Sequence, residues 1–205
     1  PKGAMEALRQ PLEDGSITIS RVAGQASFPR RFILAAAMNP CPCGYFGHPT
    51  RPCRCSPVKV AAYLSRISGP LLDRLDIHVE VPPVEYKEMS GQAPGESSAV
   101  IRRRVEAARA IQRERYRELG VGCNARLDPA QLRRFCVLTP KAQELLGQAY
   151  DKLGLSGRSY DRLLRVSRTI ADLAGEETIQ AEAVAEAIQY RNLDRKYWQP
   201  DLREL

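Results

Sequence analysis

The chain has 205 residues, of which 43% are hydrophobic and 27% are charged, and its formal net charge is +7. This composition is ordinary for one or two globular domains, and no apolar run approaches the roughly 18 residues that span a bilayer. Six cysteines without a visible secretory signal favour reduced thiols or metal ligation in a cytoplasmic protein over a disulfide scaffold.

The first predicted elements are a helix end and a β-hairpin. A helix is predicted over about 4–13, with Pro11 limiting its continuation. Residues 17–20 alternate and are β-rich, and a glycine turn precedes the second half of the hairpin over 26–29. The tip, with Arg21 beside it, is either an ordinary exposed turn or a loop that touches DNA, and the residues favour neither.

Residues 33–38 form a continuous apolar run and are predicted to be a buried parallel strand, and 77–81 are predicted to be a second one. Residues 40–57 are rich in proline and cysteine, which predicts irregular structure, whereas 58–67 predict a helix.

Beyond a predicted linker over 86–97, every expected element is helical. The helices are predicted over about 98–119, 129–136, 140–153, 156–174 and 181–191. Residues suited to N-caps precede them, namely Ser97 or Ser98, Asp128, Thr139 and Ser156.

The helix predicted over 98–119 is rich in arginine, with seven Arg against three Glu. Such a stripe can hold phosphate backbones. The alternative is a solvated face with intrahelical ion pairs, because Glu114 and Glu118 lie among the arginines at helical spacing.

Four cysteines form a candidate metal site. Cys41 and Cys43 are separated by nine residues from Cys53 and Cys55, and Zn²⁺ takes four thiolates in tetrahedral geometry. Only one residue separates the two cysteines of each pair, whereas two to four residues are usual in zinc sites. His48 is a competing ligand. Four free thiols are the alternative, but a loop without an apolar core benefits from a metal.

Three further residues suit nucleotide chemistry. Asn39 ends the first apolar run, where its amide can orient a water or contact a phosphate, although a plain Asn-Pro turn is the alternative. Arg74 can bind phosphate oxygens bidentately, or it pairs with Asp73 or Asp76. Arg158 lies in the first turn of the helix predicted over 156–174.

Four segments of the chain resemble, in their residues and in their order, the magnesium-chelatase-like family of AAA+ ATPases, in its bacterial ComM-like branch. They are 8–15, 39–44, 68–76 and 156–158. The resemblance covers nearly the whole chain. It implies an α/β remnant of an AAA+ core over 1–85, with parallel strands, a hairpin and helices, followed by an all-α helical lid domain over 98–205. It also implies three roles in ATP hydrolysis: sensor 1 for Asn39, arginine finger for Arg74 and sensor 2 for Arg158.

No Gly-x-x-x-x-Gly-Lys-[Ser/Thr] loop occurs in the sequence, and no apolar strand ending in Asp-Glu precedes Arg9. We therefore expect a C-terminal fragment that lacks Walker A and Walker B and that alone neither binds ATP tightly nor hydrolyses it. The resemblance implies that the full-length protein uses ATP and Mg²⁺, forms a ring of identical subunits, and drives helicase or branch-migration work on DNA. Two alternatives are the ATPase subunit of a metal-porphyrin chelatase and a zinc-stabilised nucleic-acid-binding module without ATPase activity.

Overall fold

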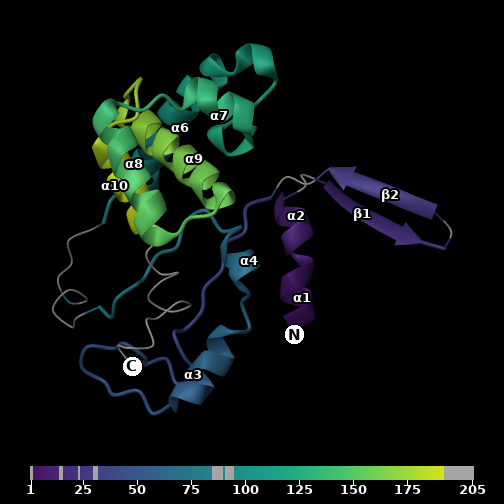
Figure 1. The fold of residues 1–205 in the computed structure, drawn as a ribbon, viewed down its shortest axis with the longest axis vertical. Coiled ribbons are helices and arrows are strands. Elements are labelled where there is room, and N and C mark those ends of the chain that lie inside the picture. The colour runs from purple at the N-terminus through teal and green to yellow at the C-terminus, as the bar shows by residue number, and fades with distance from the viewer. Residues whose placement is uncertain are drawn as a thin grey trace. The chain divides into compact units, whose positions relative to one another are not determined.

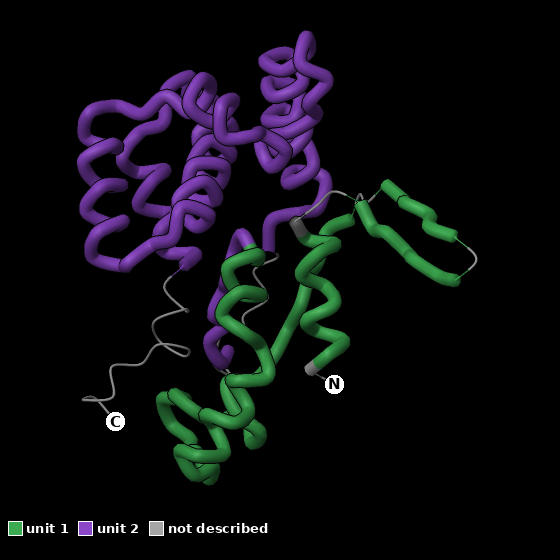
Figure 2. Tube along the Cα trace, turned by 45° about the vertical axis from the view of Figure 1, so that its right-hand side comes forward, with its two compact units in different colours: residues 1–75, 193–205 green, residues 76–192 purple. Residues whose placement is uncertain are grey.

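The computed structural model describes residues 2–13, 16–22, 24–29, 32–84, 90 and 95–191. The chain divides into two compact units (Figure 2). Unit 1 covers Pro1–Leu75 together with Leu193–Leu205, which lie outside the described residues, and unit 2 covers Asp76–Asn192. Most of the predicted linker and all of the tail beyond Arg191 also lie outside the described residues.

Unit 1 begins with two short helices and a hairpin (Figure 1). Helices α1 (Lys2–Ala7) and α2 (Arg9–Glu13) precede strands β1 (Ser16–Arg21) and β2 (Gly24–Pro29). The strands pair antiparallel, with Ser16 opposite Pro29 and Arg21 opposite Gly24, so the predicted hairpin is confirmed.

The two predicted parallel strands are not formed, and this part of the expectation is wrong. Residues 33–38 and 77–81 are irregular, with Ile33 95% exposed and Val81 82% exposed. A buried parallel strand needs backbone hydrogen-bond partners on neighbouring strands. Within the described ranges the β1–β2 hairpin is the only sheet, so nothing there supplies such partners.

The rest of unit 1 is a cysteine-containing loop and two helices, α3 (Pro57–Leu64) and α4 (Gly69–Leu72). Each helix begins after a serine whose side chain accepts a backbone hydrogen bond, Ser56 from Lys59 and Ser68 from Leu71. The buried face of α3 packs on the loop and forms a small core of Cys41, Val60 and Leu64. This core gives the loop a fixed support.

Unit 2 is helical, and the helices predicted for it are confirmed (Figure 1). They are α6 (Ser98–Arg115), α7 (Pro129–Phe135), α8 (Pro140–Leu153), α9 (Gly157–Ala174) and α10 (Ala181–Gln189), with short 3₁₀ turns at Arg117–Leu119 and Asn124–Arg126. The predicted side-chain caps all form: Ser97, Asp128, Thr139 and Ser156 each accept from a backbone N–H.

Helix α9 is the centre of unit 2, because α6, α7 and α10 all pack against it. Its apolar face contributes Leu163, Leu164 and Ala171 to the core. The principal residues that surround them are Tyr116, Leu127, Leu132, Leu146, Ile179 and Val184. None of the described helices combines the length and apolar character that a bilayer crossing requires.

Candidate functional site

The four predicted ligand cysteines lie together within unit 1. The Sγ atom of Cys41 is 3.3 Å from that of Cys43 and 3.7 Å from that of Cys53, and the Cys43–Cys53 separation is 3.6 Å. With Cys55, all four sulfur atoms lie within 4.8 Å of one another. A tetrahedral site with Zn–S bonds of about 2.3 Å has sulfur atoms about 3.8 Å apart. The cluster therefore has dimensions that could hold a metal ion.

The local backbone conformation explains why the sulfur atoms of Cys41 and Cys43 lie close together. Gly44 adopts a left-handed conformation with φ +83°, and its N–H donates to the carbonyl of Cys41 at 3.0 Å. This turn brings Cys43 back beside Cys41, so that both sulfur atoms can face the same point although only one residue separates the two cysteines. Cys41 is fully buried against α3. All six cysteines of the chain are free of disulfides.

The cysteines have divergent proton affinities. Hydrogen bonds from the backbone N–H groups of Tyr45 and Arg54 lower the pKa of Cys43 to about 6. The backbone N–H of Cys55 favours the thiolate of Cys53, but burial and the neighbouring sulfurs outweigh it and raise its pKa to about 12. One thiolate thus forms readily, whereas further negative charge in the cluster is opposed unless a cation offsets it.

His48, the competing ligand, faces its own loop. Its Nδ1 atom accepts hydrogen bonds from the backbone N–H groups of Thr50 at 3.2 Å and Arg51 at 3.0 Å. That nitrogen is therefore occupied as an acceptor, and His48 does not belong to the group of closely spaced ligand atoms. Among the described residues, the closely spaced group of possible ligands consists of the four thiols.

Asn39 is exposed and lies next to the cysteine loop. Its side-chain carbon and nitrogen are each 3.9 Å from the point where a Cβ on Gly44 would lie. Within the described part of the chain, its amide makes no hydrogen bond. Asn39, the candidate for sensor 1, therefore lies beside the candidate metal site in the structure, as it does in the sequence.

Arg74 follows the short helix α4 and is only 8% exposed. Its Nη1 atom donates to the backbone carbonyl of Pro70 at 2.6 Å. This nitrogen therefore contacts the helix that precedes Arg74. Asp76, one of the two carboxylates considered as a partner for Arg74, forms a 2.6 Å ion pair with Arg162, which sequence reasoning did not consider.

The three arginines on one face of α9 have different surroundings. Arg158 is exposed in the first turn of the helix. Arg162 pairs with Asp76, and burial lowers its pKa despite the attraction of that carboxylate. Arg165 donates to the carbonyl of Leu127 at 2.8 Å. Of the three, Arg158 has the most exposed position.

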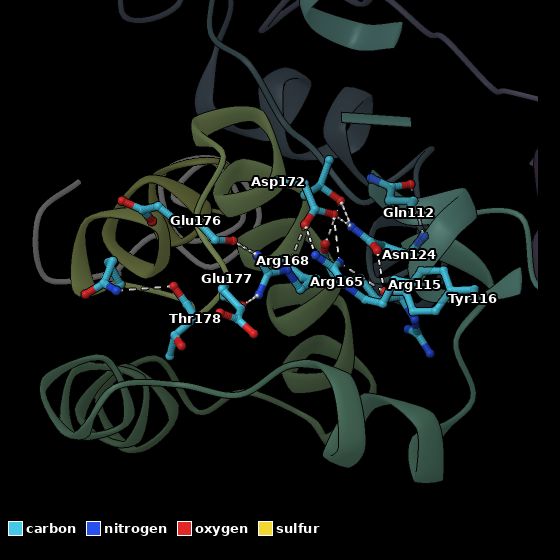
Figure 3. A network of polar contacts seen from close by, with 12 residues as sticks. Gln112, Arg115, Tyr116, Asn124, Arg165, Arg168, Asp172, Glu176, Glu177 and Thr178 are labelled. Carbon is cyan, nitrogen blue, oxygen red and sulfur yellow. Dashed lines mark hydrogen bonds and ion pairs between the residues drawn. The ribbon is translucent and has the colours of Figure 1, made fainter. Parts of the chain in front are cut away.

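A buried polar network in unit 2 was missed by sequence reasoning (Figure 3). The carboxylate of Asp172 accepts from Arg115 at 2.6 Å and from Arg168 at 3.1 Å, and both Asp172 and Arg168 are buried. Asn124 also donates to Asp172, at 2.8 Å. Arg168 in turn donates to the backbone carbonyls of Glu176 and Glu177. The only sequence signal was the i, i+4 spacing of Arg168 and Asp172 on α9.

Comparisons with known proteins agree with the resemblance seen in the sequence. Residues 1–89 match the family model described as magnesium chelatase, subunit ChlI, and residues 95–191 match the model of the ChlI C-terminal region. The chain is 45% identical over 192 residues to competence protein ComM of Haemophilus influenzae, and 42% identical over 193 residues to the uncharacterized protein YifB of Escherichia coli. It is 41% identical over 190 residues to the uncharacterized protein Rv2897c of Mycobacterium tuberculosis.

These matches cover 92–93% of this chain but 36–37% of each relative, so the chain spans little more than a third of their length. The two family models adjoin, and together they include Asn39, the cysteine cluster, Arg74 and Arg158. The chain belongs to the magnesium-chelatase-like family.

Proposed function

We propose that this chain provides the sensor and lid parts of an AAA+ motor that uses ATP and Mg²⁺ to act on DNA. The observation that carries the proposal is the tandem match of two magnesium-chelatase models in the order core, then C-terminal region. The models meet between residues 89 and 95, which supports a core part over 1–85, a linker over 86–97 and a lid domain from residue 98 on. The whole protein works as a ring of identical subunits in the cytoplasm.

Asn39 acts as sensor 1 in this proposal. Its exposed amide has no hydrogen bond within the described residues, so its carbonyl oxygen and NH₂ are available to orient a water or contact the γ-phosphate. Arg158 acts as sensor 2, supported by its exposed position in the first turn of α9. An arginine there can form a charge-assisted contact with a phosphate oxygen.

Arg74 acts as the arginine finger. Its Nη1 atom donates a hydrogen bond to the neutral carbonyl of Pro70. A phosphate oxygen is a stronger partner for a guanidinium than a neutral carbonyl, so a nucleotide on the adjacent subunit can compete with the Pro70 carbonyl. Fingers of this kind stabilise the charge of the transition state and are worth roughly 10³–10⁵ in rate.

The test uses the natural full-length protein, with ATP turnover and DNA strand displacement or branch migration as separate readouts. We expect turnover that depends on Mg²⁺ and rises with DNA, and loss of turnover in the N39A variant. If ATP turnover does not change when DNA is added and no DNA strand is moved, the proposed action on DNA is wrong. The proposed ATPase activity would still hold.

The second candidate is the ATPase subunit of a metal-porphyrin chelatase, which the description of the matching family models favours. It predicts ATP-dependent metal insertion into a porphyrin only when partner subunits are added. The two candidates therefore differ in whether DNA or a porphyrin-binding partner stimulates ATP turnover.

For the cysteine cluster we propose one structural Zn²⁺, held by Cys41, Cys43, Cys53 and Cys55. The sulfur separations of 3.3, 3.6 and 3.7 Å are close to the spacing of a zinc tetrathiolate. The core beneath the loop is small, so a metal that cross-links its two cysteine pairs supplies stability that apolar burial does not.

A further inference from the structure

The sequence around the cysteine cluster is strongly asymmetric in charge. Residues 15–72 contain no Asp or Glu, although they hold seven Lys and Arg residues. Four of the seven lie on a structural unit that we call the cysteine module, residues 40–67, which consists of the cysteine loop, helix α3 and the turn after it. They are Arg51, Arg54, Lys59 and Arg66, and all four are exposed.

None of these four cations forms an ion pair within the described part of the chain. The exposed arginines of unit 2 provide a contrast, because Arg104 pairs with Glu96 at 2.8 Å and Arg117 with Glu114 at 3.1 Å. A zinc tetrathiolate carries a net charge of about −2, which the four cations exceed. The module therefore keeps a positive surface even with its metal bound.

Two of the cations lie against tyrosine rings rather than carboxylates. The guanidinium of Arg51 lies 5.5 Å from the centre of the Tyr45 ring and donates to its hydroxyl at 3.1 Å. The guanidinium of Arg66 lies 5.4 Å from the centre of the Tyr63 ring. Such contacts orient a planar cation without neutralising it.

The module can present these groups on a fixed support. Tyr63 and Phe46 pack against the core formed by Cys41, Val60 and Leu64. The basic side chains thus project from a loop and a helix that share one core. Oriented cations lose less conformational freedom on binding than cations on a disordered segment.

We infer that the cysteine module is a contact surface for single-stranded DNA, in which the four cations hold phosphates and the two Arg–Tyr pairs stack on unpaired bases. Single-strand sites combine a positive surface with aromatic or guanidinium planes, and bases offer their faces only when unpaired. This inference rests on the proposed DNA-directed function and deepens it by naming a surface for the nucleic acid.

The test measures binding of the 205-residue chain to a fluorescent single-stranded oligonucleotide of about 20 nucleotides, longer than one ~4–16-nucleotide site. No nucleotide cofactor is added, so ATP turnover does not enter. The R51Q/R54Q/K59Q/R66Q variant should bind at least about 10-fold more weakly at low salt. The slope of log K against log salt should fall by about 3, since each phosphate contact contributes about 0.7.

The matched control is R102Q/R103Q/R109Q/R113Q, which removes the same charge from exposed positions on α6. This control should keep its affinity within about 2-fold, because those arginines are outside the proposed surface. Loss of binding in the control, with the module variant unaffected, would overturn the inference and move the DNA surface to α6. The proposed DNA motor would survive that result.

A second variant tests whether the cations contact DNA or only balance the negative charge of the thiolates. K59Q/R66Q changes only α3 and the turn after it, outside the loop that carries the cysteines. It should lose affinity for the oligonucleotide while elemental analysis still finds the wild-type zinc content. Unchanged DNA affinity, or no binding by the wild-type chain, refutes the surface.

Two further probes of the same sequence define the partner. Duplex DNA should bind more weakly than the single strand, and equal or tighter duplex binding contradicts the stacking role of the Arg–Tyr pairs. Tighter binding of the matching single-stranded RNA would assign the surface to RNA instead. Strand displacement by the full-length protein remains a separate measurement, so failure of this surface and failure of the motor are distinguishable.

Discussion

Arg162 of α9 donates a 2.6 Å hydrogen bond to the carboxylate of Asp76. Through this pair α9 holds the beginning of unit 2, which starts at Asp76, two residues after Arg74. Arg158, one turn earlier on the same helix, is exposed instead. The three arginines of this face therefore have different positions. Arg162 binds Asp76, Arg165 binds the carbonyl of Leu127, and Arg158 lies at the exposed start of the helix.

The R158A variant of the full-length protein should lose ATP hydrolysis by about 100-fold or more and no longer distinguish ATP from ADP. The physical reason is the loss of a charge-assisted contact to the γ-phosphate. Turnover and the two nucleotide dissociation constants provide the measurement. R162A and R165A are the controls and should do less, because those side chains are less exposed than Arg158. Should R162A be the inactive variant and R158A behave like wild type, the sensor assignment moves by one turn.

The R74A variant of the full-length protein should abolish turnover yet leave ATP binding nearly intact, because a finger acts on the neighbouring subunit's nucleotide. Mixing it with a Walker-A variant should restore part of the activity, since each subunit supplies the half that the other lacks. Subunit exchange is verified separately with labelled protein. No recovery in exchanged oligomers would argue that Arg74 acts within its own subunit or has a structural role, to which its hydrogen bond with Pro70 belongs.

Protein purified without chelator should contain one zinc per chain by elemental analysis. The C43S variant should lose most of that zinc and unfold at lower temperature in the cysteine module, because a three-thiolate site leaves the loop without one of its cross-links. C123S is the matched control, since Cys123 lies in unit 2 and outside the cluster. Equal zinc in C43S and wild type would show that the ligand set is wrong.

Removal of the charge of Asp172 should strongly destabilise unit 2. D172N keeps the size of the side chain but leaves Arg115 and the fully buried Arg168 without their carboxylate. Loss of one partner from a buried ion pair costs about 3–5 kcal/mol, which chemical denaturation at neutral pH can measure. The control E114Q breaks the exposed Arg117–Glu114 pair and should change the free energy of unfolding by less than about 1 kcal/mol. Similar effects of the two variants would argue that the network of Figure 3 adds little.

The helices and their starting points were predictable from the sequence because their causes are local. Ser97, Asp128, Thr139 and Ser156 each accept a backbone hydrogen bond from the residue three positions later. That contact depends only on residue type and spacing. The proximity of the two cysteine pairs was likewise predictable, since only nine residues separate them.

Tertiary structure alone decided the partners of residues that are distant in sequence. The apolar run over 33–38 predicted a strand, but a strand requires backbone partners that its own residues do not contain. The carboxylate of Asp172 joins Arg168 on its own helix to Arg115, 57 residues away, and Arg162 reaches Asp76 across 86 residues. Sequence spacing sets which side chains share a helix face, whereas packing of the helices determines which charges meet across that distance.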